Sequence, residues 1–460
     1  TYGLAIAWGL DDNLKTPYSH VFDFSITREL PHNFVLEATY TGRFAHHLLQ
    51  EIDLSEPLDL VDPKSKMDYF TAAGLLSKAA YNNVSETDPS VTSIPYWEDL
   101  FPQAAGPNGI TGSAPNGPTN PTATQNIYDL YYSNVGNETL ALEILDAFCF
   151  PACAGTGSNT IGGFVGSAGT PFQYYQDQFS SLYGWQTRGN SNYNGLQVTL
   201  RHTMAAGLQF DLNYTYSKSI DEGSNAERVN GFESGGLAFN SQVINAFSPD
   251  LWRAPSDFDT QHQLNANWVW DLPFGKGRYW GASTNKVVNG IFGGWGLNGL
   301  YRWTSGFPFS VESNAGWSTD FELEGSSFLT GPKPKTGVFR DVAGDPTVFQ
   351  NPSNFTCECF AGSAGNTTFR TTLPGEAGSR NNFRGPGYFG IDAGLSKTWN
   401  FSEQKLVKFS WEVFNVTNSV RFDAAGSLIN QDLVDITSFG KFNSTLTSPR
   451  VMQFALRFAF

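Results

Sequence analysis

The last ten residues of the chain, VMQFALRFAF, alternate between apolar and other side chains. Successive side chains of an extended chain point to opposite faces, so this period of two predicts a strand with one apolar face. For this segment alone, an edge strand of a soluble sandwich is the alternative. The apolar positions are Met452, Phe454, Leu456, Phe458 and Phe460.

Segments with the same alternation recur along the chain. In GLQFDLNYTYSKS, for example, Leu208, Phe210 and Leu212 alternate with polar side chains. About nine such strands can be counted, and TYGLAIAWG at Thr1–Gly9 is a candidate for a tenth. The other nine lie at about 19–30, 34–43, 194–202, 207–219, 262–270, 294–304, 387–399, 405–416 and 451–460.

The connections between these segments alternate in length. Four are short, at 30–33, 203–207, 273–290 and 400–404, and four are long, at about 44–191, 219–257, 305–386 and 417–448. A membrane barrel has this pattern, with tight turns on the periplasmic side and large loops outside. A soluble sandwich has no reason to gather its long loops at one end.

We therefore predict an all-β fold, an antiparallel transmembrane β-barrel portion of about nine to ten strands with long, partly helical extracellular loops. Backbone polar groups must be paired within the protein in hydrocarbon, which a closed sheet achieves. Residues 1–460 are expected to form one barrel domain, with 44–191 as a long extracellular insertion. Aromatic residues near strand ends suit the membrane interface; they are Tyr279, Trp280, Trp399 and Phe401.

Composition agrees with a membrane location. Charged residues make up 15% of the chain, against about a quarter in a typical soluble protein. No stretch approaches the roughly 18 consecutive apolar residues of a spanning helix. The net charge of −15 argues against nucleic acid as a partner. Fifteen acidic and four basic residues lie between Phe44 and Asn190, a local charge of −11 that disfavours a strongly anionic ligand.

The loops have features of their own. Helices are predicted in the stretches that begin at Asp62 and Asn137, whereas the Pro/Gly/Asn/Thr-rich stretch 101–126 is predicted to be irregular. Four cysteines form two close pairs in Gly/Ser/Pro-rich loops, and disulfides are favoured over zinc because no histidine accompanies them. A Cys-x-Cys bridge needs strained geometry, so cross-pairing between the loops stays open. The cysteines are Cys149, Cys153, Cys357 and Cys359.

Motifs for enzyme chemistry fail on context, so we expect no enzyme and no cofactor. Gly294, Gly296 and Gly299 match G-x-G-x-x-G but lack the strand–turn–helix setting of a dinucleotide site. If His46 and His47 lie on an extended segment, their side chains point oppositely, so solvated histidines are favoured over metal ligands. Asp257 and Asp259 share a face; we expect them to form hydrogen bonds at the barrel rim rather than to bind calcium.

Exposed aromatic side chains in the loops are the candidates for substrate contact. Their rings could stack on sugars or apolar ligands, although packing within the loops is the competing interpretation. These candidates are Tyr174, Tyr175, Tyr183, Trp185, Trp252 and Trp317.

From about Tyr193 to Phe460 the chain resembles the C-terminal barrel of the Oar-like TonB-dependent receptors of the bacterial outer membrane. The segments that carry the resemblance include SNYNGLQVTLRH, QLNANWVWDLPFGKGR, GGWGLNGLYRWTSGFPFSV and GPGYFGIDAGLSKTWNFSEQKLVKFSWEVFNVTN. SHVFDFSITRELPHNFVLEATYTGRFAHHL also resembles a hairpin of these barrels, and residues 60–185 match only as a variable loop.

The resemblance implies a barrel of about 22 strands filled by an N-terminal plug, which couples to TonB and imports a substrate caught by the outer loops. The five alternating apolar positions that end at Phe460 resemble the signal read by the barrel-assembly machinery. We expect the outer membrane as the location and its lipid as a surrounding. The substrate is not identified by the sequence. The alternatives are a non-transporting surface or adhesion barrel and a secreted β-rich carbohydrate-binding protein.

We expect this chain, in which no plug and no coupling motif are found, to be the C-terminal part of a longer protein. Ten strands would then form an open wall with Thr1–Gly9 and Val451–Phe460 as its edges. Because unpaired edges are not tolerated in lipid, upstream strands should join both.

Overall fold

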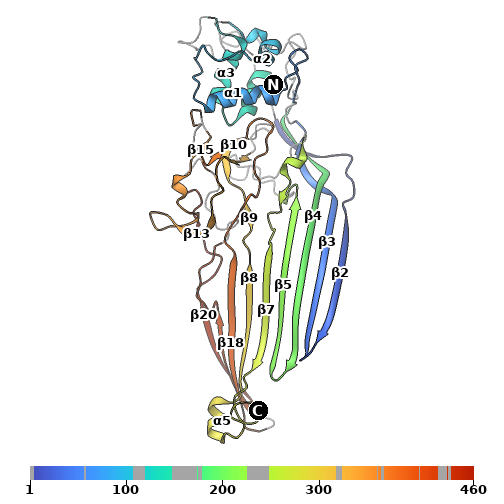
Figure 1. The fold of residues 1–460 in the computed structure, drawn as a ribbon, viewed down its shortest axis with the longest axis vertical. Helices are drawn as coiled ribbons and strands as arrows, with labels where there is room; N and C mark the ends of the chain where they lie inside the picture. The colour runs from blue at the N-terminus through green and yellow to red at the C-terminus, as the bar shows by residue number, and fades with distance from the viewer. Residues whose placement is uncertain are drawn as a thin grey trace.

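Nine long antiparallel strands form one curved sheet (Figure 1). The structure, a computed structural model, describes residues 5–55, 59–106, 120–147, 174, 179–224, 248–316, 324–359, 361–363, 367–402, 405–422, 433 and 437–460. Neighbouring strands follow the order β2, β3, β4, β5, β7, β8, β18, β19, β20, and each of the nine expected strands is confirmed. Their bounds are Tyr18–Leu30, Phe34–Asp53, Phe179–Ala205, Leu208–Asp221, His262–Asp271, Trp295–Thr304, Tyr388–Asn400, Leu406–Phe414 and Val451–Ala459.

The short connections lie at one end of the sheet and the long loops at the other, as the alternation in length predicts (Figure 1). The turn between β2 and β3 has His32 and Asn33 at φ 64° and 65°, and that between β4 and β5 has Ala206 and Gly207 at 52° and 84°. Two successive residues with positive φ make the tight turns whose twist suits a hairpin. The strands β3 and β4 continue beyond the expected loop bounds of 44 and 191, so this connection covers 54–178.

Cross-strand register gives the sheet one apolar and one polar face. Residues directly opposite each other in antiparallel strands point to the same side. One row across seven strands consists of Ile26, Ala38, Val198, Tyr214, Leu264, Trp303 and Phe389. The adjacent row across six strands consists of Ser25, Thr39, Gln197, Thr215, Gln263 and Thr304.

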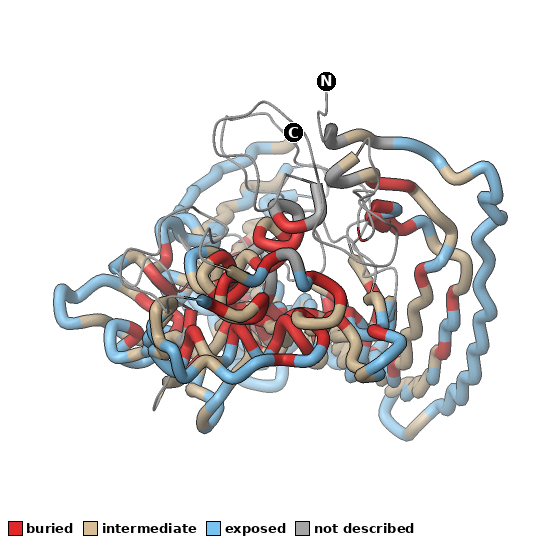
Figure 2. The backbone as a smooth tube through the Cα atoms, turned by 90° about the horizontal axis from the view of Figure 1, so that it is seen from above, coloured by how far each residue is buried: buried red, intermediate tan, exposed pale blue. Residues whose placement is uncertain are grey.

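The apolar face of the sheet is exposed. The side chains of Phe24 and Phe454, near its two edges, are 64% and 66% exposed. Buried residues gather instead in the loops beyond the strands (Figure 2). A soluble β-protein buries its apolar face, whereas a continuous exposed one marks contact with a membrane or a partner.

The first loop core lies in the connection between β3 and β4. Its helices are α1 (Tyr69–Tyr81), α2 (Pro95–Leu100), α3 (Ala123–Ser133) and α4 (Glu138–Ala147), with the 3-10 turn η1 (Pro102–Ala104). They pack around buried aromatic side chains such as Trp97 and Tyr131. The helices expected after Asp62 and Asn137 are confirmed as α1 and α4. The prediction of irregular structure up to residue 126 is wrong for α3, whose start Thr122 and Gln125 form a capping box.

The second loop core lies in the connections after β8 and β19. Phe349 packs against Phe309, Phe383 and Phe439, with ring centroids 5.2 to 5.8 Å apart. Short strands frame this core: β9 (Pro308–Phe309), β10 (Glu312–Gly316), β11 (Glu324–Ser326), β12 (Phe328–Leu329), β13 (Thr336–Arg340), β14 (Pro346–Phe349), β15 (Cys357–Glu358), β16 (Phe369–Arg370) and β17 (Phe383–Arg384).

The remaining elements are short. They are β6 (Ala254–Pro255), α5 (Lys286–Phe292), η3 (Pro249–Trp252) and η4 (Pro352–Asn354). Across the described ranges, none of the helices combines the length and hydropathy that crossing a membrane requires.

The N-terminal strand departs from the prediction. β1 (Ala5–Leu10) pairs in parallel with residues 179–185 of β4, and does not extend the sheet beyond β2. The expectation that Thr1–Gly9 forms an edge of the wall is therefore wrong. β4 continues past Ser191, where its pairing with β5 ends, and this extension leaves backbone groups that β1 satisfies. The two ends of the nine-strand path are β2 and β20, and the described residues contain no pairing between them.

The two faces of β4 give a direct test of which side meets lipid. We expect Val198→Lys, on the apolar face, to destabilise the protein by about 2–4 kcal/mol in lipid, because a cation near the bilayer midplane is costly. Gln197→Lys, one residue away on the polar face, should have little effect. Urea unfolding of the protein in phospholipid vesicles measures both, and equal effects would contradict the assignment of the faces.

Candidate functional site at the rim of the sheet

A buried arginine joins the loops at the outer end of the sheet. Arg380, in the loop after β8, is 6% exposed. Its Nη1 donates to Oδ1 of Asp221 at 2.9 Å, and its Nη2 donates to Oδ1 of Asp257 at 2.9 Å. Asp221 is the last residue of β5, and Asp257 lies in the loop that follows. One guanidinium therefore ties the end of a wall strand to two long loops.

Neighbouring side chains extend this contact. The Asn381 side-chain amide donates to Oδ1 of Asp257 at 2.6 Å and to the carbonyl of Pro255 at 2.8 Å. Arg384 forms an ion pair with Asp259, whose Oδ1 accepts the backbone N–H of Ser219 at 2.6 Å. We call Asp221, Asp257, Asp259, Arg380, Asn381 and Arg384 the rim network.

Glu222 makes a second contact beside the rim network. Its carboxylate accepts the backbone N–H of Asn190 at 2.9 Å and lies 3.8 Å from Nη1 of Arg253. Burial raises the pKa of this carboxyl, an effect that the hydrogen bonds from Asn190 oppose. The outer part of β4 is thus joined to the same loop that carries Asp257 and Asp259.

Two of the six residues of the rim network were predicted. Asp257 and Asp259 do form rim hydrogen bonds, as expected from their shared face in SDFDTQ. Arg380 and Arg384 were missed, because the segment GSRNNFRG carries no pattern that relates it to acids more than 120 residues earlier. The only sequence signal is two cations within a loop rich in Gly and Asn.

A buried carboxyl lies where β3 continues beyond β2. β2 begins at Tyr18, opposite His46, and Glu51 follows further along β3. Glu51 is 2% exposed, and burial, followed by the charge of Asp53, raises its pKa from 4.5 to about 7. Oε1 of Glu51 has no hydrogen-bond partner within the described part of the chain.

The acidic loop is less exposed than its composition suggests. Asp53 is buried and accepts the backbone N–H groups of Ser55 and Leu182, and Asp62 is buried and caps the turn at Lys64. Several of these acids therefore organise the loop, and not all of the local charge of −11 lies at its surface.

The aromatic candidates are mostly packed inside the loops. Tyr174 lies in the first loop core, with its hydroxyl 2.5 Å from that of Tyr96, and Tyr183 of β4 and Trp252 of η3 are buried as well. The expectation that these three rings are exposed is wrong; Tyr174 belongs to the aromatic core that the first long loop forms for itself. Trp185 of β4 is half-buried. Tyr175 and Trp317 lie outside the described residues.

The histidine pair shows no shared ligand geometry. Nδ1 of His46 lies 3.0 Å from Oδ1 of Asn190, and the ring of Tyr18 contacts both His46 and His47. Within the described ranges no three His, Cys, Asp or Glu side chains are grouped as a metal site. In the glycine motif, a Cβ at Gly299 would collide with the ring of Trp268, so this glycine serves packing in the wall.

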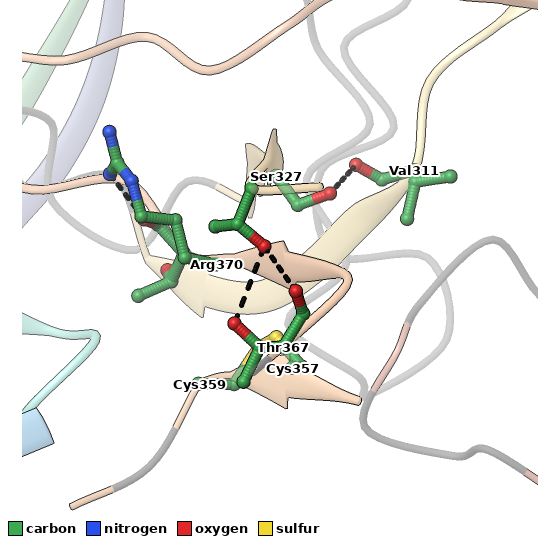
Figure 3. The surroundings of a disulfide bond; sticks show 8 residues. Val311, Ser327, Cys357, Cys359, Thr367 and Arg370 are labelled. Atoms are coloured by element: carbon green, nitrogen blue, oxygen red, sulfur yellow. Dashed lines mark hydrogen bonds between the residues drawn. A yellow bond between two sulfur atoms is a disulfide. The ribbon is translucent and has the colours of Figure 1, made fainter. Parts of the chain in front are cut away.

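Two of the cysteines form a disulfide in the loop after β8. Cys357 and Cys359 are bonded to each other, with their Cα atoms 5.2 Å apart, in β15 and just after it (Figure 3). β15 pairs with β16, whose Phe369 is buried in the second loop core. The structure thus contains the short Cys-x-Cys bridge in place of a pairing between the two distant loops. Cys149 and Cys153 lie outside the described residues.

A family model described as an outer membrane beta barrel domain matches residues 4–453. No curated protein matches the chain. Among solved structures, the outer membrane transporter YddB from Escherichia coli is similar, with 10% identity, a TM-score of 0.36, and coverage of 99% of this chain and 34% of that one. The pyoverdine outer membrane receptor FpvA from Pseudomonas aeruginosa PAO1 is 9% identical, with a TM-score of 0.31 and coverage of 97% and 30%. The chain therefore spans about a third of the length of these structures.

Replacing the central arginine should loosen the loops. We expect Arg380→Met to cost about 3–5 kcal/mol, because the carboxylate of Asp221 stays buried without its cation. Limited proteolysis should then cleave the loops after β5 and β8 faster. As the control, Arg201→Met removes an exposed ion pair with Asp211 and should cost no more than about 1 kcal/mol. Unchanged cleavage in Arg380→Met would contradict a structural role for the rim network.

The outer part of β3 should weaken as pH rises. Glu51 is neutral in the folded protein up to about pH 7 but ionises at about 4.5 when unfolded, so the folded state holds its proton between these values. Local stability is therefore greatest below pH 4.5 and falls by roughly 3 kcal/mol as pH rises to about 7. Hydrogen exchange of amides 48–53, corrected for intrinsic rates, measures this fall. Glu51→Gln should abolish it, and an identical pH dependence in both proteins would contradict the assignment.

Proposed function

Because the chain belongs to the outer membrane beta barrel domain family, we propose that it forms the C-terminal barrel wall of an Oar-like TonB-dependent receptor. Such a receptor lies in the bacterial outer membrane and takes up a substrate in an energy-coupled step. The quoted segments between Tyr193 and Phe460 support this assignment within the family. Transport would be a property of the whole receptor, to which this chain contributes barrel wall and outer loops.

The single observation that carries the proposal is the pair of chemically opposite faces on the nine-strand sheet. The exposed apolar rows suit acyl chains, and the polar rows suit a water-filled or protein-filled lumen. On the polar face, side chains bond to one another across strands: Thr41 donates to Asp23 at 2.7 Å, and Arg201 donates to Asp211 at 2.8 Å. A secreted carbohydrate-binding protein would have to leave the apolar face in water, which is unfavourable.

The loops supply the capture side of the proposed receptor. The rim network holds the loops after β5 and β8 together above the strands, where a ligand from outside would arrive. Trp185, which is half-buried, and Tyr175 and Trp317 remain our proposed contacts for an aromatic or apolar part of the substrate. Tyr174, Tyr183 and Trp252 would act by supporting the loops.

The edges of the sheet indicate how the chain fits into a closed barrel. Strands β2 and β20 each present one row of backbone groups that the described residues leave without a strand partner. Such edges are not stable in hydrocarbon. We propose that further strands of the intact receptor pair with both, which makes residues 1–460 part of a larger barrel.

Two partners follow from this assignment. The alternating C-terminal side chains ending at Phe460 would be read by the barrel-assembly machinery during insertion. An N-terminal plug in the intact receptor would engage TonB from the periplasm. The chain described here would contribute the wall around that plug.

Binding to TonB separates a transporter from a surface or adhesion barrel. We expect the full-length receptor, purified in detergent, to retain the periplasmic domain of TonB on an affinity column. Residues 1–460 alone, folded in the same detergent, form the matched control and should not retain it. Failure of the full-length protein to bind would favour the non-transporting barrel, and extraction of the protein by buffer without detergent would contradict both.

A further inference from the structure

The longest connection at the short-turn end of the sheet carries the helix α5. It joins β7 to β8 through residues 272–294 and lies at the same end of the sheet as the C-terminus of the chain (Figure 1). A hairpin needs only two to five residues to connect neighbouring antiparallel strands. The extra chain length is therefore not required by the sheet, and the question is what it does.

The end of α5 is fastened to the wall by a buried cation. Lys397 of β18 is 2% exposed, and its Nζ donates to the carbonyls of Ile291, at 3.2 Å, and Gly293. These are orphan carbonyls at the helix C-terminus, where the helix dipole favours a positive charge. Lys397 is paired in register with Trp295 and Phe409, so it lies on the same face as the apolar rows.

Two tryptophans complete this attachment. Nε1 of Trp399 donates to the carbonyl of Gly290 at 2.9 Å, and Nε1 of Trp295 donates to that of Ile291 at 2.9 Å. Their rings lie 5.2 and 5.0 Å from the ammonium of Lys397. Three wall side chains from β8 and β18 thus hold the last turn of α5 against the lipid-facing side of the sheet.

The other side of α5 is apolar and uncovered. Its positions i, i+1, i+4 and i+5 form one arc of the helix, and all four side chains there are exposed. Phe292 is 62% exposed. The four residues are Val287, Val288, Ile291 and Phe292.

The rest of the connection has the composition of a membrane-surface segment. Tyr279 and Trp280 are exposed beside α5 and are the aromatic types found at bilayer interfaces. Lys276, Arg278 and Lys286 are its charged residues, and 272–294 contains no acid, in a chain of net charge −15. Cations around an apolar helix face match the phosphate groups above acyl chains.

We propose that α5 is an interfacial anchor that inserts its apolar face into the phospholipids of the periplasmic leaflet. The short turns of such barrels lie on the periplasmic side, which places the helix at that leaflet. Its apolar face continues the lipid-facing side of the wall, since Trp295, Lys397 and Trp399, which hold the helix, lie on that side of the sheet. The wall is thereby widened by a helix on its outside, held by hydrogen bonds to side chains of β8 and β18.

Photo-crosslinking in isolated outer membranes tests this contact. The full-length receptor would carry p-benzoylphenylalanine in place of Phe292, and mass spectrometry would identify the adducts. We expect phospholipid adducts at Phe292 and at the lipid-facing Phe454 of β20. The control position Val342, which is 97% exposed in the loop between β13 and β14, should form none. The substitution at Phe292 replaces one large aromatic side chain by another, so folding should be retained.

Other adducts at Phe292 would overturn the proposal. Lipopolysaccharide there would place α5 at the outer leaflet, and an adduct with another protein would make this face a protein-docking site. No adduct at Phe292, with lipid still found at Phe454, would leave the helix in water.

A second variant tests the attachment of α5 to the wall through Lys397. Lys397→Met removes the ammonium but keeps an unbranched side chain between the two tryptophans. We expect the lipid adduct at Phe292 to be lost or reduced, while that at Phe454 remains. An unchanged yield at Phe292 would show that Lys397 does not position α5.

Discussion

Cross-strand register is the constraint on which the rest of this protein depends. Because side chains alternate with a period of two, a slip of one residue in any strand would move its phenylalanines into the lumen and its polar residues into lipid. Across the nine strands the pairing keeps the apolar side chains from Phe24 through Phe454 on one face, although β4 shifts register against β3 near Leu48 and against β5 beside the turn at Ala206–Gly207. The wall therefore has no apolar core of its own. It is stable where one side meets lipid.

The loops solve a different problem, since they leave the membrane and must pack in water. They do so with two compact cores, one helical and built on tyrosine and tryptophan, the other built on phenylalanine among short strands. The rim network fastens the second of these to the end of β5 through the buried Arg380. A buried arginine is costly to separate from its carboxylates, so this contact restrains the loops relative to the end of β5.

Local patterns in the sequence account for most of the wall and some of the loops. Alternation located all nine strands, and the helical stretches at Asp62 and Asn137 became α1 and α4. The helix α3 was missed although T-x-x-Q at Thr122 signals its start, because the surrounding Pro and Gly residues dominated the interpretation. Three of the aromatic candidates, Tyr174, Tyr183 and Trp252, are buried where exposed rings were expected, since composition does not separate a binding ring from a core ring.

The sequence by itself determined where the nine wall strands lie, which face of each is apolar, and that long and short connections alternate. The strands and their apolar faces depend on side chains two residues apart, and the lengths of the connections follow from where the strands lie, so all of these properties are local. Only the tertiary structure decided that Arg380 and Arg384 meet Asp221, Asp257 and Asp259, that β1 joins β4, and that Lys397 holds α5. Each of these contacts joins segments separated by many residues, and charges or backbone groups so far apart find one another only when the fold brings them together.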